Sequence, residues 1–155
     1  MNNLIQPSFI QLNVNATSQS EVFKTIADVA VQNGIATSAQ EVVEGLHVRE
    51  QQSTTGFQDG FAIPHTHAEA IVKPAIVIVR TENGVEWESF DDQPAFFFLS
   101  LLIPKTAAGT THLKALASLS RMLMNEDKRQ GLLDAKTNES LAELIGNTLT
   151  ESGGN

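Results

Sequence analysis

The sequence predicts an α/β fold, a single-domain sandwich whose mixed sheet of four to five strands is flanked by helices on both faces. Segments with helical periodicity alternate with strand-like runs, and the end of the chain is helical. Residues 95–103 form a strand that is apolar on both faces, so helices must cover it on both sides. The length of 155 residues fits one domain, which we place at residues 1–150, with 151–155 as a flexible tail.

The N-terminal part contains one predicted strand and two predicted helices. Residues 9–14 alternate partially between apolar and polar side chains, which indicates a strand. Ser18 and Ser38 each precede a glutamate by three residues, the spacing of a capping box, so each is expected to begin a helix. Gly34 ends the first helix, and the second fades near residues 49–52.

The rest of the chain adds strands and then helices. Asn83-Gly84 is a hairpin signal, with a short return strand expected after it. The expected strands are residues 61–63, 75–79, 85–87 and 95–103. Three helices follow Pro104, and their expected N-caps are Thr110 or Thr111, Asn125 and Asn138.

Composition and motifs exclude several classes of protein. A net charge of −8 argues against nucleic-acid binding, and the absence of cysteine excludes thiolate zinc sites and thiol nucleophiles. The run 95–103 is too short to span a bilayer, and residues 1–6 lack a signal-peptide pattern, so we expect a cytoplasmic protein without membrane insertion. The phosphate-binding motifs G-x-x-x-x-G-K and G-x-G-x-x-G and the hydrolase motif G-x-S-x-G are all absent.

His65 is the most informative histidine because it directly follows Pro64 at the end of a short apolar run. The residue before a proline is driven toward extended backbone, and proline fixes its own φ angle. We therefore expect His65 to leave a rigid strand end at a defined angle. An imidazole held in that way suits a task in which one ring nitrogen is aimed at a partner.

Two other histidines have more than one interpretation. His67 forms an H-x-H pair with His65, which could bind a metal together with His112 or a carboxylate, although such a pair also arises by chance. His112 lies in the first turn of a predicted helix, where free N–H groups attract anions. It could face an anion there or only hydrogen-bond at the helix start. Arg49 matters if the fold brings it beside His65.

With the nucleotide-binding, thiol and serine-hydrolase motifs absent, the remaining interpretation is that a histidine itself becomes covalently modified and carries the transferred group. A neutral imidazole, with an unperturbed pKa of about 6.5, is nucleophilic at one nitrogen, and a backbone carbonyl bound to the other ring N–H selects that tautomer. Transfer of a phosphoryl group depends on positioning and positive charge. Arg49 and the helix terminus at His112 could supply that charge.

Several motifs together are similar to those of a known family. They are Arg49-Glu50, Ser53-Thr54-Thr55-Gly56, Gly60-Phe61-Ala62-Ile63-Pro64-His65, Lys73-Pro74-Ala75, Gly84-Val85-Glu86-Trp87 and Thr111-His112-Leu113-Lys114-Ala115-Leu116. On these motifs the chain resembles the enzyme IIA domain of the fructose/mannitol type in the bacterial phosphoenolpyruvate-dependent sugar phosphotransferase system. The resemblance extends from about Phe9 to Ile145.

The resemblance implies that His65 receives a phosphoryl group from the carrier protein HPr and passes it, through Nε2, to a cysteine of a IIB component. The transfer would accompany uptake and phosphorylation of a fructose-like sugar. Arg49 and His112 match the positions that surround the phosphate, while His67 matches no functional position. No metal and no other cofactor is implied. The chain departs from the family at Gln58, where glycine or a small residue is usual.

Two other hypotheses remain open at this point. In the first, phosphorylation of the same histidine controls docking of a regulatory module, as in nitrogen-linked relatives. In the second, His65, His67 and His112 bind a metal ion in a hydrolase. The sugar itself is not encoded in the sequence, because a IIA domain handles only the phosphate.

Overall fold

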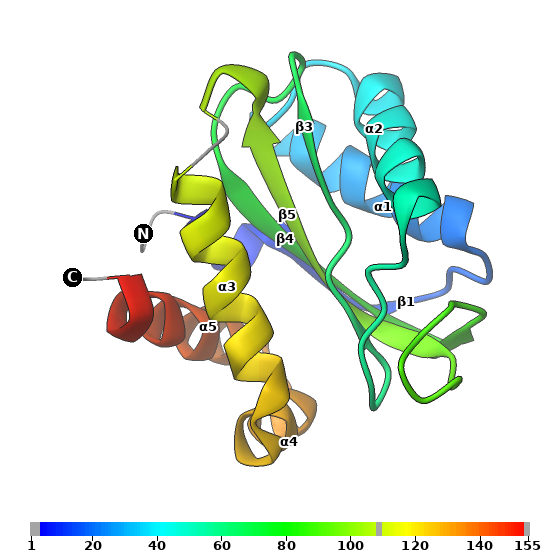
Figure 1. Cartoon of the computed structure of the whole chain (residues 1–155), viewed down its shortest axis with the longest axis vertical. Coiled ribbons are helices and arrows are strands. Elements are labelled where there is room, and N and C mark those ends of the chain that lie inside the picture. Colours follow the sequence, from blue (N-terminus) through cyan, green and yellow to red (C-terminus); the bar gives the residue numbers. More distant parts are fainter. Residues whose placement is uncertain (1–3, 108–109, 154–155) are drawn as a thin grey trace.

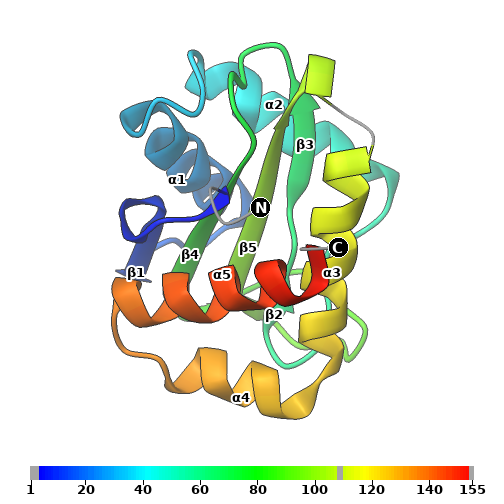
Figure 2. The same cartoon turned by 90° about the vertical axis from the view of Figure 1, so that its left-hand side faces the viewer.

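The protein is a three-layer sandwich in which a single sheet lies between two layers of helices (Figure 1). The computed structural model describes residues 4–107 and 110–153, without the side chains of residues 107, 110–112 and 151–153. Helices α1 and α2 cover one face of the sheet, and α3, α4 and α5 cover the other (Figure 2). The predicted fold class is therefore confirmed.

The sheet has five strands and is centred on β5. Its elements, in chain order with the helices, are β1 (Ile10–Val14), α1 (Gln19–Gln32), α2 (Ala39–Gln52), β2 (Phe61–Ala62), β3 (His65–Ala68), β4 (Ala75–Val85), β5 (Ala95–Pro104), α3 (Thr110–Met124), α4 (Glu126–Asp134) and α5 (Asn138–Gly153), with short 3₁₀ turns at Pro7–Phe9 and Lys105–Ala107. The strand order is β1-β4-β5-β2, and β3 also pairs with β5. Only the β4–β5 pair is antiparallel.

Strand β5 separates two hydrophobic cores because its side chains point alternately to the two faces. Phe98 and Leu102 join the core beneath α1 and α2. Phe97, Leu99 and the two apolar residues at alternate positions beyond them join the core beneath α3 and α5. Nine of the ten residues of β5 are buried, which confirms the prediction of a central strand that is covered on both sides.

The predicted helix starts are confirmed at three serine and asparagine caps. The Oγ atoms of Ser18 and Ser38 each accept the backbone N–H three residues later, at 3.2 Å. Asn125 Oδ1 accepts the N–H of Lys128 at 3.0 Å. Each bond satisfies an N–H that the helix cannot use internally. The expected cap at Thr110 or Thr111 lies among side chains outside the described part of the structure.

Two local predictions are wrong. Asn83-Gly84 does not form a hairpin turn, because β4 continues through it to Val85, which pairs with Ala95 of β5. A register shift between Arg80 and Val85 absorbs the irregularity there, as a β-bulge does. The chain instead reverses through residues 86–94.

The cap of α5 is the second correction. Thr137, and not Asn138, caps this helix, since Thr137 Oγ1 accepts the N–H of Ser140 at 3.0 Å. The Asn138 amide instead donates to the carbonyls of Pro7 and Ile10, which ties α5 to the start of the chain. The helix continues to Gly153, past the predicted boundary at residue 150, and the division into a domain and a tail stays a prediction. Within residues 4–107 and 110–153, no helix has the length and apolar character needed to cross a membrane.

Candidate functional site

His65 opens strand β3 directly after a break in the edge of the sheet. Strands β2 and β3 both run parallel to β5, and Ile63 and Pro64 separate them. Pro64 cannot donate a ladder hydrogen bond, but its carbonyl accepts the N–H of Leu101 at 3.0 Å. The sequence predicted a strand end before His65. The structure instead fixes the histidine from both sides, by the proline before it and by its own pairing with Leu101.

The imidazole of His65 is held by the backbone two residues earlier. Its Nδ1 lies 2.6 Å from the carbonyl oxygen of Ile63. A carbonyl oxygen only accepts hydrogen bonds, so Nδ1 carries the proton, and in the neutral ring Nε2 carries the lone pair. The residue is 8% exposed, so the surrounding fold covers most of it.

Arg49 reaches the same place from the last turn of α2. This helix packs closely on β3 because Gly45 has no side chain: a Cβ at that position would lie 2.6 Å from Thr66 Oγ1. The guanidinium donates through Nη1 to the carbonyl of Ser53 at 2.9 Å. In the described part of the chain Arg49 makes its hydrogen bonds only through Nη1, to the carbonyl and the hydroxyl of Ser53.

Arg49 and His65 together line two neighbouring cavities. The larger, of about 460 Å³, lies between α2 and β3, and its other lining residues are Gly45, Val48, Gln52, Thr66 and His67. The smaller, of about 160 Å³, reaches beneath the segment 54–57 toward α3, where Leu116 and Ser120 line it. The fold therefore brings two of the three predicted site residues to one place.

The third predicted residue, His112, lies in the first turn of α3, and its side chain is outside the described part of the structure. Leu116 and Ser120 of the same helix line the smaller His65 cavity. His67 is exposed and lies on β3 two residues beyond His65. Among the side chains that the structure describes, which do not include His112, no group of three or more His, Asp or Glu residues could hold a metal ion.

Glu50 is part of the motif Arg49-Glu50, but nothing in the sequence predicted a role for its side chain at the site. The Glu50 carboxylate accepts hydrogen bonds from the backbone N–H and the hydroxyl of Thr55 and from the Trp87 indole, at 2.7–3.2 Å. The only available signal was the run of hydroxyl residues after α2, because short polar side chains there are ready donors to a carboxylate. The tryptophan partner comes from residue 87, and only the fold places it there.

The loop at Gln58 also differs from the family pattern in an informative way. The backbone carbonyl of Gln58 accepts the N–H of Phe61 at 3.2 Å. Asp59 (φ 56°) and Gly60 (φ 87°) adopt left-handed backbone conformations. A side chain on Gly60 would overlap the Phe96 ring, so only glycine fits there. The positive φ angles of this turn fall on Asp59 and Gly60, so residue 58 can carry a large side chain.

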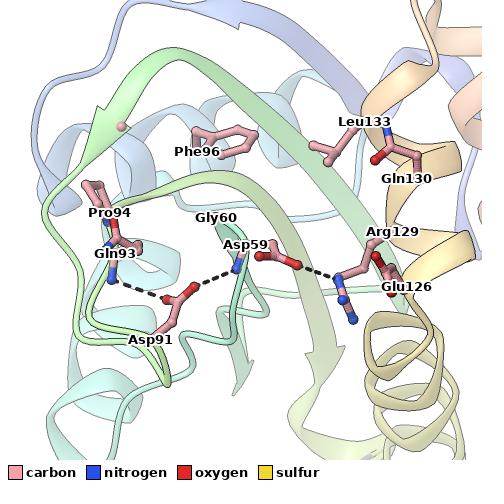
Figure 3. Close-up of a pocket in the computed structure, with 11 residues that line it drawn as sticks. Asp59, Gly60, Asp91, Gln93, Pro94, Phe96, Glu126, Arg129, Gln130 and Leu133 are labelled. Atoms are coloured by element: carbon pink, nitrogen blue, oxygen red, sulfur yellow. Dashed lines mark hydrogen bonds and ion pairs between the residues drawn. The ribbon is translucent and has the colours of Figure 1, made fainter.

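A further cavity, of about 520 Å³, lies beside this loop and includes none of the predicted site residues. Figure 3 shows Asp59 between Asp91 and Arg129. Arg129 Nε donates to Asp59 at 2.9 Å and Nη1 donates to the Leu123 carbonyl at 2.6 Å. The backbone N–H of Asp59 holds the pKa of the Asp91 carboxyl below its ordinary value. These contacts join the loop to α4.

Comparison with known proteins identifies the family. The sequence profile described as "Phosphoenolpyruvate-dependent sugar phosphotransferase system, EIIA 2" matches residues 3–148. The chain belongs to this family. The resemblance drawn from the sequence motifs is therefore confirmed, and EIIA 2 is a family of phosphotransfer proteins.

Three curated relatives illustrate the range of the EIIA 2 family. The chain is 34% identical over 142 residues to the "PTS system fructose-specific EIIABC component" of Bacillus subtilis, covering 92% of this chain and 22% of that protein. It is 32% identical to the "PTS system fructose-specific EIIA component" of Haloferax volcanii, covering 88% of each. It is 30% identical to the "Nitrogen regulatory protein" of Pseudomonas aeruginosa, covering 92% of each.

Among solved structures, the nitrogen regulatory protein IIA-Ntr from Neisseria meningitidis superposes with a TM-score of 0.84 at 24% identity. The match covers 93% of this chain and 97% of that one. An EIIA 2 fold is thus shared over nearly the whole described chain.

Proposed function

We propose that this EIIA 2 chain is the phosphoryl-carrier subunit of a sugar phosphotransferase system. His65 Nε2 attacks the phosphorus of a phosphohistidine on HPr, so that one N–P bond forms while the other breaks. A cysteine thiolate of a cognate IIB component then takes the phosphoryl group, and His65 returns to its neutral form. Both partners would meet the chain in the cytoplasm, and the sugar would be fructose-like, as the names of two relatives suggest.

The observation that carries this proposal is the 2.6 Å contact between His65 Nδ1 and the Ile63 carbonyl. This hydrogen bond keeps the proton on Nδ1, so the lone pair is already on Nε2 and the ring need not change tautomer during transfer. The break at Pro64 and the pairing with β5 fix the ring, so the nucleophile is positioned before the donor arrives.

Arg49 is the proposed source of positive charge. Phosphoryl transfer passes through a loose transition state with negative charge spread over three oxygens, so cationic donors beside it lower the barrier. Arg49 lines both cavities that His65 lines. His112, at the N-terminal turn of α3, is proposed as a second phosphate-binding residue on the family pattern.

Incubation with phosphoenolpyruvate, enzyme I and HPr tests the carrier directly. Mass spectrometry under alkaline conditions, where an N–P bond survives, should show one added phosphate on the wild-type chain and none on His65→Ala. His67→Ala is the matched control, because the same change is made two residues along the same strand. A labelled His65→Ala variant, or an unlabelled wild type beside a phosphorylated HPr, would show that the proposal is wrong.

A regulatory module is the second candidate, and the nitrogen regulatory relative supports it. Both candidates require the phosphohistidine and differ in the fate of the phosphoryl group. A sugar-transport subunit should transfer its label to the cysteine of a IIB protein encoded nearby. A regulatory module should keep the label in the presence of that protein and should bind its target differently in the two states.

A further inference from the structure

Glu50 stands at the centre of a hydrogen-bonded cluster beside the site. Its Oε2 accepts the backbone N–H of Thr55 at 2.7 Å and the Trp87 indole N–H at 3.2 Å. Its Oε1 accepts the Thr55 hydroxyl at 2.7 Å. Three donors from two chain segments thus converge on a single carboxylate. An ionised carboxylate can only accept, and these bonds use most of its capacity.

A chain of hydrogen bonds leads from Glu50 to the imidazole. The N–H of Thr55 donates to Glu50, and the carbonyl of Thr55 accepts the N–H of Ile63 at 3.0 Å. The carbonyl of Ile63 in turn accepts His65 Nδ1 at 2.6 Å. Three bonds therefore connect the carboxylate to the ring nitrogen. Each of these bonds fixes the position of one backbone group, and that group makes the next hydrogen bond in the chain.

We propose that Glu50 is a positioning residue that holds His65 in the tautomer with the proton on Nδ1. It does so by fixing residues 54–56 against α2, so that Thr55 places the segment containing Ile63 and its carbonyl faces the ring. Glu50 does not touch the ring itself. The consequence for phosphoryl transfer rests on the proposed function, whereas the tautomer is a property of the unmodified protein and can be measured separately.

The chemistry of the cluster predicts which substitutions are tolerated. Alanine removes all three acceptor contacts. Glutamine keeps one oxygen for the two donors to Oε2, and its amide can donate to the Thr55 hydroxyl, which is able to accept. Aspartate keeps the charge but is one methylene too short to hold the Thr55 amide. We therefore expect glutamine to rescue what alanine loses, and aspartate to behave like alanine.

The experiment compares the ring nitrogens of His65 in ¹⁵N–¹H NMR spectra, with His65→Ala identifying its signals. In Glu50→Ala and Glu50→Asp the tautomer with the proton on Nε2 should become populated, and transfer from phosphorylated HPr should slow by about 10–100-fold. Glu50→Gln should keep the wild-type spectrum and most of the rate. Glu41→Ala is the matched control, because Glu41 lies on the same helix and accepts the N–H of Ala70 at 2.6 Å, at the far end of α2.

The outcomes separate the inference from the proposed function. Wild-type tautomer and rate in Glu50→Ala would overturn the inference, and so would an equal change in Glu41→Ala, which would indicate general loosening of α2. If Glu50→Ala does not fold, an unchanged spectrum in Glu50→Asp overturns it instead. A wild-type chain that takes no phosphate refutes the carrier proposal alone, because the comparison of tautomers still decides the role of Glu50.

Discussion

Pro64 lacks a backbone N–H, and the edge of the sheet is interrupted there before it resumes with His65. The carbonyl of Pro64 accepts the N–H of Leu101 on β5, and successive carbonyls of a strand point in alternate directions, so the carbonyl of Ile63 points away from β5. The Ile63 carbonyl therefore binds the imidazole and takes no part in the ladder. Pro64 helps to fix the position of the histidine that follows it.

Arg49 carries the prediction that belongs to a single residue. Arg49→Ala should slow transfer from phosphorylated HPr by about 100-fold, because one donor to the transition-state charge is lost. Arg49→Lys should recover part of the rate, since lysine keeps the charge but lacks the planar fork. Rapid-quench measurement of the phosphorylated chain gives the rates.

The control for Arg49 is Arg121→Ala, which removes an exposed arginine from α3. It changes the net charge by the same amount and should leave the rate within about twofold of wild type. An equal loss of rate in both variants would mean that the overall charge matters for docking, and that Arg49 has no specific role in transfer.

At the scale of elements, residues 53–60 join α2 to β2, and residues 54–56 of this connection form a wall of the candidate site. Gly56 lies against the backbone of Glu88, and a Cβ there would overlap the Glu88 carbonyl. Thr54 Oγ1 bridges the two segments by donating to that carbonyl and accepting the Gly56 N–H. Close contact between these two backbones therefore depends on glycine.

Gly56→Ala should lower the free energy of unfolding by about 1–3 kcal/mol, the usual cost of overpacking. It should also slow transfer, because the displaced backbone lines the smaller His65 cavity. Urea denaturation measures the first effect. Gly146→Ala in α5 is the control, since nothing lies within 4 Å of its Cβ position and alanine favours a helix. Equal stabilities for the two variants would contradict the crowding argument.

Most elements could be predicted because local rules decided them. The serine N-caps at Ser18 and Ser38 and the apolar run of β5 are decided by neighbouring residues alone, so they could be predicted from the sequence. The predictions failed where distant residues decide. Asn83-Gly84 continues as strand because Val85 has a partner on β5, and Asn138 turns away from the helix to bind the N-terminal segment.

The candidate site shows the same division. His65 and Arg49 were found from local motifs, and the fold brings them to shared cavities. The role of Glu50 could not be found in that way, because it depends on Trp87, 37 residues along the chain, and on a loop that folds back onto α2. The catalytic contributions of His65, Arg49 and His112 stay predictions.

At the scale of the whole molecule, the sheet isolates two cores from each other. Arg49 comes from α2, which covers one face of the sheet. His65 pairs with Leu101 of β5, and Leu101 belongs to the core beneath the opposite face, so the His65 side chain points to that opposite face. Leu116 and Ser120 bring α3, from the other layer, to the same cavity. The site therefore lies where the two layers meet at the edge of the sheet.

Acid should weaken the whole fold through carboxylates at the ends of elements. The Thr17 hydroxyl, at 2.7 Å, and the Thr17 N–H hold the pKa of Glu21 below its ordinary value of 4.5. A lowered pKa in the folded state means that the stabilisation is fully present above about pH 4.5 and is lost as the pH falls through the folded value.

Thermal unfolding of wild type and Glu21→Gln between pH 3 and 7 measures this contribution. The wild type should be the more stable chain near neutral pH, and the difference should shrink toward pH 3. A gap between the two unfolding temperatures that is constant with pH would show that the Glu21 charge is not involved.

Trp87 is the only tryptophan in the sequence, and it packs against Phe23 of α1 and Phe98 of β5 while its indole binds Glu50. The protein thus contains an intrinsic fluorophore that is connected through Glu50 and Thr55 to Ile63, the residue whose carbonyl binds the His65 ring. Its emission can report changes around His65 in real time, without a dye, a tag or an added cysteine.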